Sequence, residues 1–325
     1  MKLFNQSIIV QAAVVLLALA ALWFRALAEP VAMQGGSGAV LYDLLAGWLA
    51  PAPLAATIAA MLLVLAEGVA LNLLMADVGL VSQNSLLPTL LFVICMSAPA
   101  TTLTPAILVA AILIACTRQL LLKGTLLTIS IDRACTTTAL IGLCSMFCLP
   151  AALMMISYML VAINYRLYGW KDWAVLFLGF LAPYVLLVAV LALTGGLVPW
   201  WQGVTDALSG WSMNMGDFTA LEGVANTALA LALLAGVIRV WNLSRERTVV
   251  WQKNASVMLI YIIGGAAMLL TFRLFPVDMQ LFGLPFSFCV ACLLTPARRS
   301  MSRRKSKEWV HYTLLIIIFA AALLC

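Results

Sequence analysis

Charged residues are scarce in this chain. Of 325 residues only 9% are charged and 65% are hydrophobic, whereas soluble domains carry roughly 25% charged residues. A chain with so few charges cannot cover a water-facing surface with polar side chains. Long apolar runs recur from Ile8 to the end, and runs of about 18 or more apolar residues predict membrane-spanning helices. The soluble class is therefore excluded, and we expect an all-α polytopic transmembrane bundle.

Histidine is almost absent, and catalytic sequence motifs are missing. His311 is the only histidine, which argues against a histidine-based mechanism and a multi-histidine metal site. No phosphate-binding loop, dinucleotide-binding glycine pattern, zinc-protease helix motif or serine nucleophile elbow is present. The sequence therefore identifies no cofactor and predicts no metal site.

The eight cysteines are expected to pack rather than to react. Nearly all of them lie inside apolar runs, where cysteine behaves as a small hydrophobic residue. Cys289 and Cys292 have a redox or metal-binding spacing, but they fall in the middle of a predicted span without a partner pair. Cys144 and Cys148 are interpreted in the same way.

The apolar runs predict about eleven spans in a single integral membrane domain, 1–325. Nine to twelve are compatible with the runs, because several runs are short. The first run is long for the apolar core of a signal peptide, so we expect it to be retained. The proline-flanked stretch 84–122 either crosses twice or forms a re-entrant hairpin. The predicted spans are 7–28, 54–76, 84–98, 104–122, 132–148, 150–167, 173–194, 223–241, 255–274, 280–295 and 310–325.

The distribution of basic residues predicts the orientation. With the N-terminus in the cytoplasm, sixteen of the eighteen Lys and Arg residues fall on the cytoplasmic side, where basic residues are enriched. The C-terminus is then periplasmic, the basic loop 297–309 is cytoplasmic, and the expected location is a bacterial inner membrane. The net charge of +6 is thus a topology signal. Membrane lipids are the expected partners, and no nucleic acid is.

Two external loops, 29–53 and 195–222, are predicted to contain amphipathic interfacial helices. In Gly38–Leu49 the apolar residues recur at helical spacing and leave Asp43 on another face, and Pro199–Phe218 has a similar stripe with two tryptophans. Amphipathic helices that carry Trp lie at the bilayer interface. Both helices are therefore expected to cover the outer membrane surface. No internal repeat is recognisable in the sequence.

Two arginines break the positive-inside pattern at the outer ends of spans. Arg25 and Arg273 each have an acidic residue nearby, Glu29 and Asp278. Arginine binds phosphate through a planar fork of donors, and a carboxylate such as Asp43 can act as a general base. These groups would suit a site for a polyprenyl-phosphate-linked glycan. The alternative is that the arginines snorkel and pair with their neighbouring acids.

Glu67 lies near the middle of the second predicted span, with Asn72 five residues further on. A charged side chain at the bilayer centre costs about 2.5–3.5 kcal/mol on insertion scales, so such residues tend to face a cavity or a partner. The proline-broken region 84–105 beside this span favours a transporter site. The alternative is a protonated glutamate that is hydrogen-bonded to a neighbouring helix.

The region from about Asn72 to Thr194 resembles an uncharacterised family of multi-pass inner-membrane proteins from Bacteroidota. The resemblance implies a bacterial inner-membrane location and no particular activity. Some members carry a carotene-oxygenase label, but that chemistry needs several iron-binding histidines and this chain has one. The matching features are Asn72-Leu73-Leu74, Asn84-Ser85-Leu86-Leu87-Pro88, Pro99, Pro105, Asp132–Ala134, Tyr165–Trp173, Gly179 and Pro183-Tyr184.

Three functional hypotheses follow. The first is a protein that acts on a lipid-linked saccharide in envelope glycan assembly, with Arg25 and Arg273 on the phosphate and Asp43 or Glu29 as base. Its layout is loosely similar to membrane glycosyltransferases and polymerases that use polyprenyl-linked sugars. The second is a transporter or flippase with a midplane site near Glu67. The third is a non-catalytic subunit of an envelope, secretion or motility complex.

Overall fold

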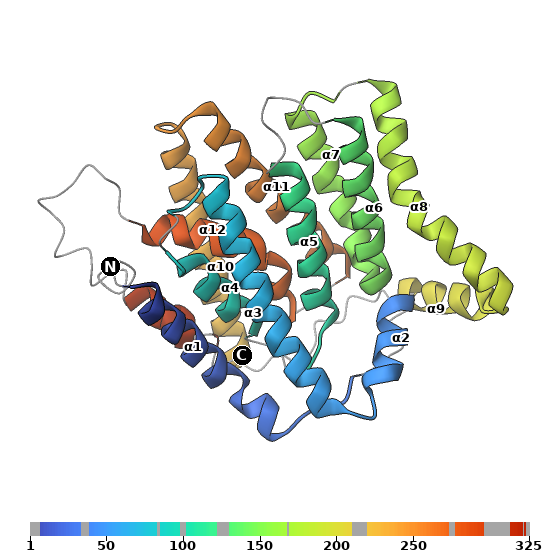
Figure 1. Cartoon of the computed structure of the whole chain (residues 1–325), viewed down its shortest axis with the longest axis horizontal. Helices are drawn as coiled ribbons and strands as arrows, with labels where there is room; N and C mark the ends of the chain where they lie inside the picture. Colours follow the sequence, from blue (N-terminus) through green and yellow to red (C-terminus); the bar gives the residue numbers. More distant parts are fainter. Residues whose placement is uncertain are drawn as a thin grey trace, which may run out of the picture.

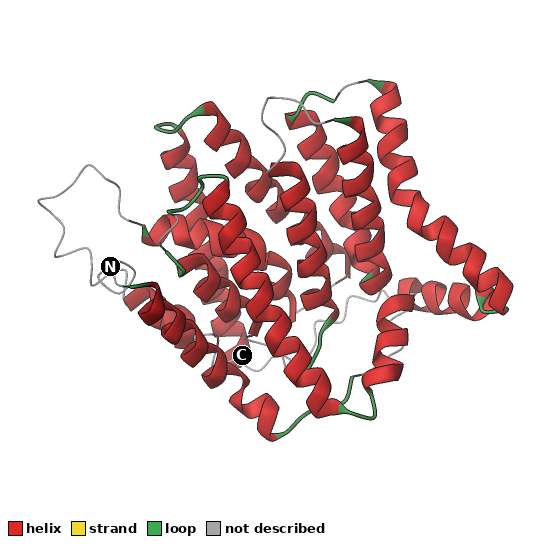
Figure 2. Cartoon of the chain, viewed as in Figure 1, coloured by secondary structure: helices red, strands yellow, loops and turns green. Residues whose placement is uncertain are grey.

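The described residues form helices, most of them joined by short connections. The computed structural model describes residues 7–33, 39–82, 85–97, 102–121, 130–167, 169–209, 220–272, 277–295, 313–320 and 322. No strand occurs among these residues (Figure 2). The helices are α1 (Ile8–Ala28), α2 (Val40–Leu49), α3 (Pro53–Asp77), α4 (Leu87–Ser97), α5 (Pro105–Leu121), α6 (Ile131–Phe147), η2 (Leu149–Leu153), α7 (Met154–Asn164), α8 (Trp170–Thr194), α9 (Leu197–Ser209), α10 (Ala220–Ser244), α11 (Val249–Phe272), η3 (Val277–Phe282) and α12 (Gly283–Leu294).

The prediction of an all-α membrane protein is confirmed at this level. In the described part of the chain, four helices are long and apolar enough to cross a membrane: α1, α3, α8 and the Asn226–Ser244 part of α10. Several other apolar helices, among them α4 and α5, are shorter. The two loops that were predicted to be external each contain a helix, α2 and α9, although the second half of the predicted stretch Pro199–Phe218 lies outside the described residues.

Proline and glycine set several helix ends. Pro53 occupies the first turn of α3, where its missing N–H has no helical partner in any case. α8 begins after Gly169, whose N–H donates to the Asp172 carboxylate at 3.1 Å. It ends at Gly195, which takes a left-handed conformation with φ of 74° that glycine adopts without steric cost.

Two short helices, α4 and α12, occupy the centre of the molecule. Every residue of α4 is buried, and in α12 only Leu293 is not fully buried. The two pack against each other, with α1 and α3 around α4 and with α10 and α11 around α12. An eleven-residue helix is about 16 Å long, roughly half the hydrocarbon thickness of a bilayer. α4 and α12 are therefore half-length helices enclosed by protein.

Side chains from α1 hold both ends of α4. The Gln11 carboxamide oxygen accepts from the Leu86 N–H at 2.8 Å at the start of α4. At its end, the Trp23 indole N–H donates to the Ser97 hydroxyl at 2.8 Å. The first bond pairs a backbone N–H at the start of the helix, where N–H groups have no partner within the helix, and the second joins two side chains. The order of the contacts shows that α1 and α4 run in the same direction.

The helix pair α3–α4 is repeated by α11–α12. In both copies a long helix is followed by a linker and then by a half-length helix. A shift of 197 residues aligns residues 53–97 with 250–294 without a gap. The identical pairs are Met61/Met258, Leu62/Leu259, Gly68/Gly265, Ala70/Ala267, Leu73/Leu270, Gln83/Gln280, Leu87/Leu284, Pro88/Pro285, Val93/Val290 and Cys95/Cys292.

The same alignment brings buried positions together. Matching buried pairs on α3 and α11 are Thr57/Asn254, Ala60/Val257, Val64/Tyr261, Glu67/Gly264, Gly68/Gly265 and Leu71/Met268. A shift of 214 residues aligns α1 with α10 in the same manner. It matches the buried pairs Val15/Leu229, Ala18/Ala232, Leu19/Leu233 and Ala26/Val240. We therefore define a first repeat of α1, α3 and α4 and a second repeat of α10, α11 and α12.

The two repeats have opposite directions. In Figure 1, α1 and α3 are connected through α2 at the lower edge of the molecule, whereas α10 and α11 are joined by a turn at its upper edge. This is an inverted repeat, and the interpretation that the chain has no internal repeat is wrong. The copies are separated by α5–α9 and share only ten identities over 45 aligned positions, so the helix boundaries and the buried positions are needed to recognise the register.

Helices α6 to α9 lie at the edge of the bundle. α6 and α8 pack closely through two glycines: a Cβ added at Gly142 would lie 2.5 Å from the Phe180 carbonyl oxygen, and one added at Gly179 would meet the Cys135 carbonyl oxygen at 2.6 Å. The outer side of α8 exposes many large apolar residues. Figure 1 shows α8 leaning away from α6 toward its C-terminal end, with α9 turning back toward α2.

Candidate functional site

Glu67 is buried in the protein core. Its side chain is 4% exposed, and neither carboxyl oxygen has a hydrogen-bond partner among the described residues. The hypothesis that Glu67 is hydrogen-bonded to a neighbouring helix is therefore wrong for this conformation. Buried polar groups are hydrogen-bonded in most proteins, and an exception needs an explanation. The sequence singled out this residue because of its place near the middle of a span.

Gly68 brings α3 against α4 beside Glu67. A Cβ added at Gly68 would lie 3.2 Å from the Thr89 side chain and 3.4 Å from Phe92. The Thr89 hydroxyl donates to the Gly68 carbonyl oxygen at 3.1 Å, so its proton is already used. The equivalent pair in the second repeat is Gly264–Gly265. Gly264 thus stands in the second repeat at the position of Glu67.

Asn72 is buried, with 5% exposure, but it does not share a helix face with Glu67. A separation of five residues turns a side chain about 140° around an α-helix. The two residues were predicted to share a site, but the geometry of α3 directs them to different neighbours. Glu67 is therefore the centre of the candidate site by itself.

Gln280 links the two repeats and was not predicted. It is 1% exposed; its carboxamide N–H donates to the Met96 carbonyl oxygen at 2.7 Å. Its carboxamide oxygen accepts from the Thr104 hydroxyl at 2.9 Å. These bonds join the segment before α12 to the end of α4 and the start of α5. One signal in the sequence could have pointed to this residue. Gln280 stands five residues before Pro285, just as Gln83 stands five residues before Pro88, but the match is recognisable only once the repeat is known.

The predicted outer site is only partly described. Arg25 and Glu29, at the end of α1, are exposed, and Asp43 on α2 is half-buried. α1 packs on α3 and α4, whereas α2 packs on α3 and α6, so the main helix contacts do not gather these groups. Arg273 and the side chain of Asp278 lie outside the described residues.

Tyr42 fixes α2 beside the start of α5. Its hydroxyl donates to the Leu103 carbonyl oxygen at 3.2 Å. Burial raises the pKa of Tyr42, and the neighbouring Asp43 carboxylate raises it further. The phenol therefore keeps its proton and remains a donor at neutral pH. This contact orients the helix that carries Asp43.

The cysteines lie in apolar packing positions. Cys289 and Cys292 are buried free thiols in α12, and the Cys144 thiol lies 3.9 Å from the Val109 carbonyl oxygen across the α5–α6 contact. Within the described ranges, no three His, Cys, Asp or Glu side chains come together to hold a metal ion. These observations fit the packing interpretation of both cysteine pairs.

Comparison of the chain with protein-family models, with curated proteins and with solved structures finds no match. The resemblance to the Bacteroidota membrane proteins stays a prediction.

Proposed function

We propose that the protein is a transporter of the bacterial inner membrane that works by rocking its two inverted repeats against each other. The observation that carries the proposal is the contact of two half-length helices, α4 and α12, between inverted repeats. Many transporters are built from such repeats, and their sites lie near the bilayer midplane where discontinuous helices meet. Glu67 precedes Gly68, which packs against α4, and lies near the middle of a helix long enough to cross the membrane.

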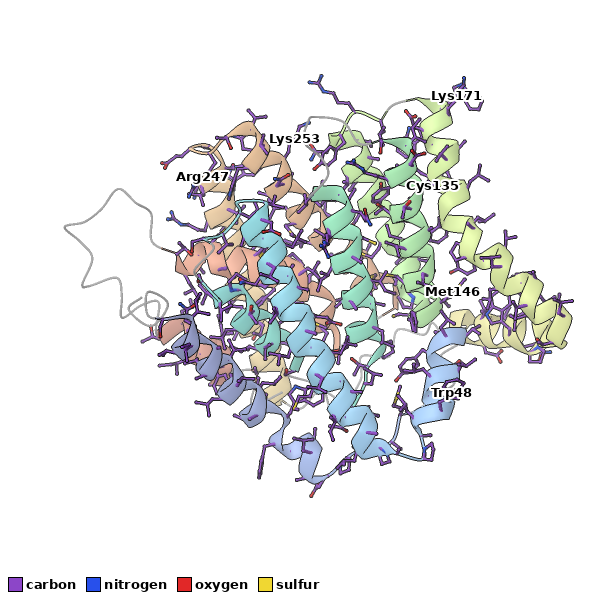
Figure 3. The ribbon with its side chains drawn as sticks, in the orientation of Figure 1. Trp48, Cys135, Met146, Lys171, Arg247 and Lys253 are labelled. Atoms are coloured by element: carbon purple, nitrogen blue, oxygen red, sulfur yellow. The ribbon has the colours of Figure 1, made fainter. Side chains whose placement is uncertain are left out.

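The proposed topology has eleven spans, a cytoplasmic N-terminus and a periplasmic C-terminus. Figure 3 shows Lys171, Arg247 and Lys253 at the upper end of the molecule and Trp48 near the lower end. The Arg247 guanidinium lies 5.8 Å from the centre of the Trp251 ring, and the Lys253 ammonium lies 5.4 Å from the Tyr165 ring. Such cation–aromatic pairs at one end support a cytoplasmic interface there.

In this topology Gln280 closes the outer side. The segments that it joins, before α12 and before α5, lie on the periplasmic side of the half-length helices. Opening toward the periplasm breaks both of its hydrogen bonds. Buried hydrogen bonds contribute about 0.5–1.5 kcal/mol each, so their loss would shift the opening equilibrium by about 5–150-fold.

The other two hypotheses have less support. The lipid-linked saccharide hypothesis needs Arg25 and Asp43 in one site, and the described contacts do not gather them. A non-catalytic subunit would need no half-length helices at an inverted contact and no buried carboxyl group. Both hypotheses are distinguished from a transporter by whether the centre of the molecule opens to each side in turn.

Two native thiols report on this opening. Cys95 on α4 and Cys292 on α12 are equivalent in the repeat, and they are 0% and 5% exposed. A membrane-impermeant maleimide is applied to right-side-out and inside-out vesicles, and mass spectrometry locates the label. We expect Cys95 to react from the periplasmic side and Cys292 from the cytoplasmic side. Gln280→Ala should raise the Cys95 rate by about 5–150-fold, because it releases the outer closure.

The controls use the same helix and a helix outside the repeats. Ser287→Ala also removes a buried hydrogen bond in α12, but this bond stays within the helix, to the Leu284 carbonyl oxygen at 2.8 Å. It should leave the Cys95 rate unchanged, and Cys144 on α6 should stay unlabelled. If Cys95 and Cys292 stay unreactive from both sides in the wild type and in Gln280→Ala, the proposal of a transporter is rejected in favour of a rigid subunit.

A further inference from the structure

Glu67 is the only carboxylic side chain that is buried among the described residues. Both of its oxygens lack a hydrogen-bond partner there, and the next residue, Gly68, is where α3 packs against α4. Burying an ionised carboxylate without a partner is far more costly than burying a neutral one. The position is therefore suited to a group that changes its charge or binds a cation when the protein opens.

The helices around α3 supply no charge that pairs with Glu67. None of their ionisable side chains forms a hydrogen bond with its oxygens among the described residues. The nearest charged group on its own helix, Asp77, is about 15 Å away along the axis. The ionisable residues of the elements packed on α3, and of α3 itself, are Arg25 on α1, Tyr42 and Asp43 on α2, Asp77 on α3, Cys95 on α4, and Cys116 and Arg118 on α5.

The geometry favours a proton over a metal cation. A hard metal ion needs several oxygen ligands around it, about six or more for calcium. The Gly68 carbonyl oxygen already accepts from Thr89, Asn72 is turned to another side of α3, and no cluster of metal-binding side chains exists within the described ranges. A proton needs only one carboxylate oxygen. The ligand class that this site can satisfy with its own atoms is therefore the proton.

We propose that Glu67 is the proton-binding group of the transporter and that its protonation controls closing, an inference that rests on the proposed transport function. In the closed conformation the carboxyl group is neutral. When one side opens, water reaches Glu67 and the carboxyl group releases its proton to that side. The closed state returns after a proton is taken up again, because closing over the ionised group would bury an unpaired charge.

This inference fixes the sign of a pH dependence. The open state binds fewer protons than the closed state, so raising the pH favours the open state. For one proton the opening equilibrium changes by at most about tenfold per pH unit. The Glu67→Gln variant keeps a neutral polar side chain of similar size at this position. It should remove this dependence and hold the protein closed.

The test measures labelling of Cys95 and Cys292 in the full-length protein as a function of pH. Rates are divided by that of an exposed thiol on the same side, introduced as Ala52→Cys for Cys95 and as Lys171→Cys for Cys292, because thiols themselves react faster at high pH. We expect the corrected rates to rise with pH in the wild type and in the matched control Asp77→Asn. Corrected rates in Glu67→Gln should be low and independent of pH.

Four outcomes decide the inference. If both thiols alternate between sides but the corrected rates do not depend on pH, the proton proposal is overturned and the transporter proposal stands. If replacing sodium and potassium by choline removes the opening at constant pH, a metal cation is the ligand and the proton proposal fails. If neither thiol is labelled from either side, the transporter proposal itself fails. Should Glu67→Gln not fold, the carboxylic acid C=O infrared band of the wild type decides, since its absence at neutral pH rules out a neutral Glu67.

Discussion

Replacement of Glu67 by leucine is expected to make the protein more stable and to stop it from opening. The carboxyl group is buried without a partner, so its removal relieves a desolvation cost of about 1–3 kcal/mol. Leucine fills a similar volume with apolar atoms. We expect a higher melting temperature in detergent together with loss of Cys95 and Cys292 labelling. Such a trade of function for stability is common at working sites.

The matched control for this variant is Ala66→Leu. Ala66 precedes Glu67 on α3 but is exposed, so leucine there changes the same helix without entering the protein core. It should leave both the melting temperature and the labelling nearly unchanged. A Glu67→Leu protein that melts well below the wild type would show that the carboxyl group makes a stabilising contact, which contradicts an unpaired Glu67.

The second large effect is expected at the contact of α6 with α8. Gly179→Ala would place a Cβ 2.6 Å from the Cys135 carbonyl oxygen, and Gly142→Ala would place one 2.5 Å from the Phe180 carbonyl oxygen. Backbone cannot yield as a side chain does, so the helices must separate. Overpacking of this kind costs about 1–3 kcal/mol. We expect each variant to lower the melting temperature, and the two effects to be less than additive because the helices separate only once.

Gly47→Ala is the control for both glycine variants. Gly47 lies within α2, and nothing stands within 4 Å of a Cβ added there. Alanine in a helix interior is more favourable than glycine by up to about 1 kcal/mol, so this variant should melt at or above the wild-type temperature. Equal melting of Gly179→Ala and Gly47→Ala would contradict the close contact of α6 and α8.

The all-helical class and most helix positions could be predicted from the sequence, because apolar runs and prolines act locally. Pro53 and Pro105 open α3 and α5 for a reason that needs no tertiary structure. Glu67 was also predictable as a candidate, since a carboxyl group in a long apolar run is costly wherever it lies. Local chemistry was sufficient in each of these cases.

The burial of α4 was not predictable in the same way. A short apolar run with prolines is compatible with a span, a hairpin or a core helix. Which of these forms depends on the helices that pack around it, α1, α3 and α12. The role of Gln280 depends on two groups that are far away in the sequence, the Met96 carbonyl oxygen as acceptor and the Thr104 hydroxyl as donor. Long-range contacts of this kind leave no local pattern.

The inverted repeat also explains an exception to the positive-inside pattern. Arg25 near the end of α1 is equivalent to Arg239 near the end of α10. Because the repeats run in opposite directions, the proposed topology puts the same position of the repeat on the outer side in one copy and on the inner side in the other. Arg25 thus needs no phosphate ligand to account for its place, which weakens the strongest sequence argument for a lipid-linked saccharide.

The most direct test of the inverted repeat is the sidedness of its two helix connections. Ala52→Cys lies between α2 and α3, and Arg245→Cys lies in the turn between α10 and α11; both positions are exposed. In intact spheroplasts, a membrane-impermeant maleimide should label Ala52→Cys and leave Arg245→Cys unlabelled until the membrane is permeabilised. Labelling of both positions from the same side would contradict the inverted repeat and the transport function built on it.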